Sequence, residues 1–230
     1  MKGLSDCAKG SLPMSRELLE ATVKLMLKNT VITLELFFFA LVLSMFLGLL
    51  LAVGRRSRIR PLSTLIRLYL LVMRGTPLIL QLMFFYYGPY YIFGMTPLPR
   101  VTAAIVGLSL NSAAYSCEIF RAGIESVSVG QQEAAKVLGF SRYQTFTKIT
   151  LPQVVKHVLP PFSNECMALV KNTSLAQIIG VVELFRVANI QMSKYFSTIP
   201  LLIAALFYLV MCTVIERVFY LLEKRYSYYR

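Results

Sequence analysis

The sequence is poor in the residues that build metal centres and disulfide frameworks. It has a single histidine, His157, and its four cysteines, at positions 7, 117, 166 and 212, are widely separated with no C-x-x-C pair. Three of the four lie in apolar segments, which is typical of small packing residues. We therefore expect neither a metal site nor a set of disulfides in this chain.

Charged residues are also scarce, and acidic ones most of all. Only 15% of the residues are charged, 57% are hydrophobic, and the mean hydropathy is +0.63. A soluble protein of 230 residues needs more polar surface than this, so we predict an integral membrane protein. The net charge of +13 is then best explained by cytoplasmic loops and contacts with lipid head groups, and it does not indicate nucleic-acid binding.

Signatures of catalysis are missing as well. The sequence has no phosphate-binding loop of the G-x-x-x-x-G-K-[ST] type and no G-x-S-x-G nucleophile motif. We therefore expect a non-catalytic chain that binds no cofactor of its own. The residues before Cys7 contain no apolar stretch, so neither a cleaved signal peptide nor a lipoprotein anchor is expected.

Five segments are apolar over about the twenty residues that a helix needs to cross a bilayer core of roughly 30 Å. They cover residues 31–53, 65–92, 101–124, 158–182 and 199–222, and the second is interrupted near Arg74. The connections are short, so a single all-α transmembrane domain is expected over residues 1–230.

The distribution of basic residues predicts an orientation for these spans. Fourteen lysines and arginines belong to connections on one side and eight to those on the other. This places the C-terminus and the connection 125–152 in the cytoplasm, and the N-terminal segment 1–28 outside. Within that segment, residues 15–28 are expected to form an amphipathic helix on the outer face.

One polar connection, residues 133–152, predicts a helix, a turn and a second helix. A run of good helix formers stops at Gly139, the residue type that best adopts the left-handed conformation at a helix end. Ser141 and Gln144 are spaced as a capping box, and Pro152 is expected to help stop the second helix near Leu151. A pair of short helices between membrane spans is typical of a docking surface for a partner protein.

The spacing within this connection is E-A-A-x3-G-x9-I-x-L-P, beginning at Glu133 and ending at Pro152. It resembles the cytoplasmic EAA loop of permease subunits in ABC importers. Further matches resemble the polar amino acid permeases of the type I fold, over nearly the whole chain from Asn29 onward. They are Arg74-Gly75-Thr76-Pro77 with Gln81, the stretch from Asn111 through Tyr115, Glu118 and Arg121 to Gly123, and Asn164-Glu165 followed by Leu169 to Leu175. One departure is Asn172, where that family usually has an aspartate.

The resemblance implies a five-span permease that moves polar amino acids into the cytoplasm by alternating access, in a bacterial inner membrane. It implies two ATPase subunits that bind ATP-Mg, a second identical or homologous permease, and an extracytoplasmic amino-acid-binding protein. The residues expected to couple to the ATPase are Glu133, Ala134, Ala135, Gly139, Leu151 and Pro152. The alternative from another class is an ion-coupled secondary transporter that uses Glu118 or Glu165 as a proton site.

Polar residues inside the spans are the candidates for contacting substrate. Asn111, Tyr115 and Glu118 are spaced at i, i+4 and i+7, on one helical face, and Glu118 either lines the substrate path or pairs with Arg121. Glu165 and Asn172 share a face of the fourth span, while Lys171 points to a different side. Glu165 and Lys171 either contact substrate or are balanced by protein partners that fix helix packing.

Three further features leave alternatives open. The motif at residues 74–77 predicts a break with Thr76 as N-cap and Pro77 in the first helical position, which either attracts a carboxylate or only sets the direction of the next helix. Aromatic residues at 84–91 fit a belt at the outer interface or a closure of the pathway. The connection 183–195 either touches the delivering protein or is an ordinary interfacial helix.

Overall fold

The computed structural model describes residues 16–226, and this part of the chain is helical with no strand. In chain order the elements are α2 (Arg16–Arg55), α3 (Arg60–Gly75), α4 (Leu78–Phe93), α5 (Arg100–Glu125), α6 (Val129–Val137), α7 (Arg142–Thr145), η1 (Phe146–Thr150), α8 (Leu151–Asn172), η2 (Thr173–Ile179), α9 (Leu184–Tyr195) and α10 (Ile199–Tyr226). The prediction of an all-α membrane fold is confirmed.

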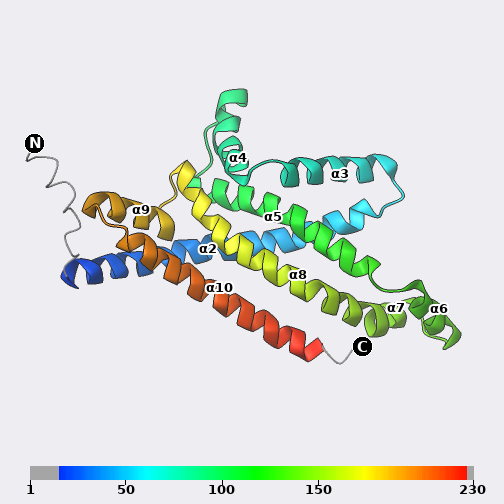
Figure 1. The fold of residues 1–230 in the computed structure, drawn as a ribbon. Helices are drawn as coiled ribbons and strands as arrows, with labels where there is room; N and C mark the ends of the chain where they lie inside the picture. The colour runs from blue at the N-terminus through cyan, green and yellow to red at the C-terminus, as the bar shows by residue number, and fades with distance from the viewer. Residues whose placement is uncertain (1–15, 227–230) are drawn as a thin grey trace, which may run out of the picture.

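The long helices α2, α5, α8 and α10 lie side by side, and α6 and α7 lie at the far end of α5 and α8 (Figure 1). Three helices, α2, α5 and α10, are each long and apolar enough to cross a membrane alone. Two bent pairs add to them: α3 with α4, bent by 111°, and the segment 142–179 with α9, bent by 58°. The five predicted spans correspond to these three helices and two bent pairs.

Small residues let α2 and α5 approach closely. A side chain at Gly48 of α2 would place its Cβ 2.6 Å from Cβ of Ser116 on α5, so only glycine fits there. Further along the same contact, toward the start of α5, Leu36, Ala104 and Leu108 are fully buried. Close backbone approach through small residues is the usual way in which membrane helices pack tightly.

The prediction of a separate amphipathic helix at residues 15–28 is wrong within the described residues. From Arg16 onward this segment is the first part of α2, a continuous helix of 40 residues, because no glycine or proline interrupts it before Gly48. At 1.5 Å per residue α2 is about 60 Å long, which exceeds a bilayer core of about 30 Å. Met26 is fully buried among apolar residues of α9 and α10, including Leu184 and Val187. Residues 1–15 lie outside the described part of the chain.

The helical hairpin at residues 129–145 has the local structure that the sequence predicts. Gly139 adopts φ +75°, and the amides of Gly139 and Phe140 donate to the carbonyls of Lys136 and Ala135, both at 3.0 Å, as in a Schellman motif. The capping box is also confirmed: Ser141 Oγ accepts from the Gln144 amide at 3.2 Å, and Gln144 Oε1 accepts from the Ser141 amide at 2.8 Å.

The second helix of the hairpin does not stop at Pro152, which corrects the prediction. It passes from α7 through a single π-helical turn, η1, directly into α8, and Pro152 lies in the first turn of α8. A wider turn accommodates a proline because it displaces the carbonyl that the ring would otherwise meet. The hairpin and the fourth span are therefore one continuous helical segment from Arg142 to Asn172.

The break between α3 and α4 is confirmed, but its capping differs from the prediction. Thr76 is not the N-cap: Pro77 holds residue 76 in an extended conformation, α4 begins at Leu78, and Thr76 Oγ1 donates back to the Val72 carbonyl at 2.8 Å. Gln81 fixes the bend instead. Its Nε2 donates to the carbonyls of Met73 and Thr76 at 2.9 and 3.1 Å and to Thr76 Oγ1 at 2.8 Å.

Replacing Gln81 by leucine is expected to loosen this bend. Gln81 is buried, and the variant removes its hydrogen bonds to the Thr76 carbonyl and hydroxyl, while the Met73 carbonyl and the Asn111 amide keep only their bond to each other. We expect a loss of about 2 kcal/mol in the free energy of unfolding, measured by chemical unfolding in detergent micelles. Thr76→Ala removes one acceptor of Gln81 and one bond to the Val72 carbonyl, both at an exposed residue, and should cost less than half as much. Equal stability of Gln81→Leu and the native chain would contradict the assignment.

Candidate functional site

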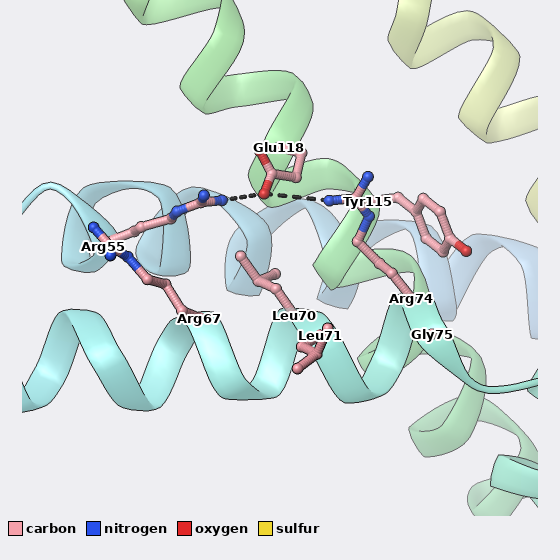
Figure 2. Close-up of a pocket in the computed structure, with 8 residues that line it drawn as sticks. All are labelled: Arg55, Arg67, Leu70, Leu71, Arg74, Gly75, Tyr115 and Glu118. Atoms are coloured by element: carbon pink, nitrogen blue, oxygen red, sulfur yellow. Dashed lines mark hydrogen bonds and ion pairs between the residues drawn. The ribbon is translucent and has the colours of Figure 1, made fainter.

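A pocket of about 450 Å³ lies between the end of α2, the polar face of α3 and the C-terminal half of α5 (Figure 2). Its walls are Arg55, Arg67, Leu70, Leu71, Arg74, Gly75, Tyr115 and Glu118. Arg67 and Arg74 come from the same side of α3, because seven residues are almost two full turns. Three arginines and one glutamate give this pocket an excess of positive charge.

Glu118 is the centre of the charge arrangement. Its carboxylate pairs with Arg55 of α2, with Arg74 of α3 at 3.3 Å, and with Arg121 of its own helix at 2.8 Å. Figure 2 shows Arg55 and Arg74 reaching this carboxylate from opposite sides. Arg121 also pairs with Glu125, one turn further along α5. The predicted alternative in which Glu118 pairs with Arg121 is therefore confirmed, and the pair belongs to a larger network.

The predicted polar stripe of α5 faces α3 and the break that follows it. Asn111 is buried and donates to the Met73 carbonyl at 3.1 Å and to Gln81 Oε1 at 3.0 Å. Tyr115 lies against Arg74, whose guanidinium carbon is 5.6 Å from the ring centroid. Asn111 therefore fixes the bend, while Tyr115 and Glu118 border the pocket; contact of any of the three with substrate stays a prediction.

Glu165 and Asn172 do not line this pocket. Glu165, on α8, is partly buried, and its Oε1 accepts a hydrogen bond from Ser112 Oγ of α5 at 2.6 Å. Asn172 is the last residue of α8, where the chain tightens into η2. Lys171 lines a different pocket, with Ser174 and Tyr208, so it points to another side, as predicted. The substrate role of Glu165 and Asn172 also stays a prediction.

The hairpin presents an apolar tip that the sequence analysis missed. Val137, Leu138 and Tyr143 are 88, 74 and 76% exposed, and Val129 and Phe146 are also more than half exposed. Exposed apolar side chains gathered on a short polar segment mark an interaction surface. The signal in the sequence is the pair of apolar residues Val137 and Leu138 just before Gly139, within a connection that is otherwise polar.

The residues expected to couple to a partner differ in exposure. Glu133 and Ala134 are exposed on α6, while Ala135 is buried within the hairpin. Gly139 is exposed at the turn, Leu151 is 40% exposed and Pro152 is partly buried at the start of α8. Three of the exposed members, Glu133, Ala134 and Gly139, belong to the same helical hairpin as the apolar tip.

Metal-binding groups and cysteines were the other candidates for a functional site. Residues 16–226 hold no group of three or more His, Cys, Asp or Glu side chains that could bind a metal ion. Cys117 and Cys166 are buried free thiols and Cys212 is a partly exposed one, while Cys7 lies outside the described residues. The prediction that Cys117 and Cys166 are packing residues is confirmed.

Comparisons with known proteins agree on one class. The family described as "Binding-protein-dependent transport system inner membrane component" matches residues 44–228. The probable amino-acid ABC transporter permease protein YckA of Bacillus subtilis is 39% identical over 198 residues, which cover 86% of this chain and 87% of that protein. The L-cystine transport system permease protein TcyB of the same organism is 36% identical over 200 residues, covering 86% of this chain and 84% of that protein.

Solved structures show the same fold. A crystal structure of an amino acid ABC transporter with histidines aligns over 93% of this chain and 100% of its own, with a TM-score of 0.83 and 33% identity. The MetNI methionine ABC transporter in an inward-facing conformation aligns over 93% of this chain and 99% of its own, with a TM-score of 0.69 and 18% identity. The second likeness concerns the fold alone.

Proposed function

The chain belongs to the family of binding-protein-dependent transport system inner membrane components, and we propose that it is the permease subunit through which an ATP-driven importer moves polar amino acids into the cytoplasm. It is a multi-pass protein of the inner membrane. The proposed coupling to an ATPase rests on one observation: the exposed apolar tip of the hairpin is joined to the fourth span without a break. Nothing in the sequence relationships favours the ion-coupled alternative.

The hairpin is the element on which an ATPase subunit acts. Closure of two ATPases on ATP-Mg brings two such hairpins together, one from this chain and one from a second identical or homologous permease. Because residues 142–172 form one helical segment, movement of the tip turns α8 as a rigid body. The cavity then switches from facing inward to facing outward, where an extracytoplasmic binding protein delivers the amino acid.

Membrane lipid and the second permease contact the exposed apolar surface of this chain. Side chains such as Phe38, Phe46 and Leu71 are 60, 63 and 70% exposed on α2 and α3, which suits contact with membrane lipid and with the second permease. The N-terminus is outside and the C-terminus in the cytoplasm, on the strength of the basic connections. The permease contributes no catalytic group, and hydrolysis takes place in the ATPase subunits.

Substrate contact is assigned to the polar residues of α5 and α8. Glu118 and Tyr115 border the arginine-rich pocket, and Glu165 lies one helix away with its carboxylate held by Ser112. A carboxylate in an apolar surrounding binds an ammonium group strongly because little water competes there. Asn111 positions the wall of the pocket, and the amide of Asn172 is suited to the backbone groups of an amino acid.

Replacing Glu165 by glutamine tests this assignment. Glutamine keeps an oxygen for Ser112 but loses the charge that would hold the ammonium group. We expect at least a tenfold lower affinity, about 1.4 kcal/mol, for the best-bound member of a panel of radiolabelled polar L-amino acids on the purified permease and ATPase complex in lipid nanodiscs. Glu216→Gln, an exposed residue of α10, is the matched control, and unchanged affinity in Glu165→Gln would refute the contact.

A further inference from the structure

A second pocket, of about 330 Å³, lies at the opposite end of α5 from the coupling hairpin. It is formed where α4, the start of α5, η2 and the start of α9 meet, and its wall includes Tyr87, Arg100, Gln177, Gly180 and Arg186. In the proposed orientation this is the extracytoplasmic end, where the amino acid arrives. The volume is at the lower end of the range of small-molecule pockets, about 300–1,000 Å³.

The two arginines of this pocket have no acidic residue among the residues that line it. Arg100 donates to two neutral acceptors, the Tyr86 hydroxyl and the Gly180 carbonyl, both at a long 3.4 Å. Arg186 is exposed at the side of α9. Two guanidinium groups facing one space without a carboxylate among its walls favour the binding of an anion.

The acidic residue nearest to Arg186 in the sequence, Glu183, is turned away from the pocket. Glu183 is fully buried, and its carboxylate accepts from the amides of Phe185 and Arg186 at 2.8 and 2.7 Å. The hydroxyl of Tyr208 on α10 donates to the same carboxylate at 3.1 Å. Glu183 therefore caps α9 from inside the protein, and that capping fixes the backbone of Arg186 while leaving the charge of its side chain free for a ligand.

Arg100 is held in place by the backbone of the opposite wall. Gly180 adopts φ +82° and ends η2, and a Cβ at this position would lie 3.0 Å from Nη1 of Arg100. Gln177, one turn earlier, accepts a hydrogen bond from Asn189 of α9 at 2.7 Å, which ties the two walls together. The guanidinium of Arg100 thus rests against a shaped surface, which preorganises it for a bidentate ligand.

We propose that this outer pocket receives the α-carboxylate of the incoming amino acid, which Arg100 and Arg186 bind before the substrate moves to the residues of α5 and α8. The inference rests on the proposed function and adds a first binding site to it. The guanidinium forks match the two oxygens of a carboxylate, and the ring of Tyr87 borders the space left for the rest of the molecule. The site would recognise what all amino acids share, so it would not select among side chains.

Chemical protection of the two arginines tests the proposal on the unaltered protein. The permease and ATPase complex in nanodiscs is treated with phenylglyoxal, and modification of each arginine is followed by mass spectrometry. A saturating mixture of protein L-amino acids without arginine, whose guanidinium group would consume the reagent, should slow modification of Arg100 and Arg186 by roughly fivefold or more. The corresponding mixture of amino acid amides, which lack the carboxylate, should not protect, and exposed Arg56 should react equally in all samples.

Variants separate this inference from the proposed function. In proteoliposomes with the binding protein outside, Arg186→Gln should lower uptake at limiting substrate, and Lys194→Gln, the control at another exposed basic residue of α9, should not. If the native complex shows ATP-driven uptake but amino acids protect neither arginine, the outer site is refuted and the proposed importer function is retained. A second result would also overturn the outer site. In it, the binding protein docks more weakly to Arg186→Gln, and amino acids and their amides protect Arg100 equally well, so that the carboxylate has no role. Absence of any ATP-driven amino acid uptake removes the proposed function and this site with it.

Discussion

Replacing Glu118 by glutamine is expected to destabilise the permease and to reduce transport by more than tenfold. The carboxylate pairs with three arginines from α2, α3 and α5, and its side chain is only 19% exposed. Without its charge, three guanidinium groups remain close together with no shared partner. Removing one member of a partly buried charge network should cost roughly 2–3 kcal/mol in the free energy of unfolding, and the mutual repulsion should open the pocket between these helices.

Glu125→Gln provides the matched control for that variant. Glu125 pairs with Arg121 alone in the network and is 48% exposed, so its loss should cost less than about 1 kcal/mol. Both variants are compared by chemical unfolding in mixed micelles and by uptake in proteoliposomes. If Glu118→Gln unfolds with the stability of Glu125→Gln and transports at the native rate, the network has no role in holding this site.

Replacing Leu138 by aspartate is expected to separate the permease from its ATPase. Leu138 is 74% exposed at the tip of the hairpin, next to the turn at Gly139. A charge placed there would be buried without a partner when an ATPase cleft closes over the tip, which is strongly unfavourable. We expect the ATPase to be lost during affinity purification of the tagged permease, and ATP-dependent uptake to fall to the background.

The same variant should leave the permease folded, because Leu138 makes few contacts inside the chain. Its insertion and its elution as a single species in size-exclusion chromatography are the checks. Gln132→Asp adds the same charge at an exposed position inside α6 and should retain the ATPase. Stoichiometric ATPase on Leu138→Asp would place the docking surface elsewhere.

Local chemistry explains which parts of the fold could be predicted from the sequence. The turn at Gly139 and the capping box of Ser141 and Gln144 depend on residues within a few positions of one another, so spacing alone is informative. Pro152 shows the limit. A proline usually ends a helix, but a π turn immediately before it lets the helix continue, and no short-range pattern announces that turn.

The candidate site was predictable only in part, because its contacts also join residues that are far apart in the sequence. The spacing of Asn111, Tyr115 and Glu118 correctly predicts one helical face. What that face meets depends on Arg55 and Arg74, which are 63 and 44 positions from Glu118 in the sequence. The outer pair, Arg100 and Arg186, is brought together by the packing of four elements, and neither residue stands out in the sequence by itself.

The most direct test of the central claim is uptake of radiolabelled amino acids into proteoliposomes that contain the permease with its ATPase and the extracytoplasmic binding protein. Uptake should require ATP inside the compartment that the hairpins face, and should persist when ionophores abolish proton and sodium gradients. Uptake by the permease alone, driven by an imposed ion gradient and indifferent to ATP, would contradict the account.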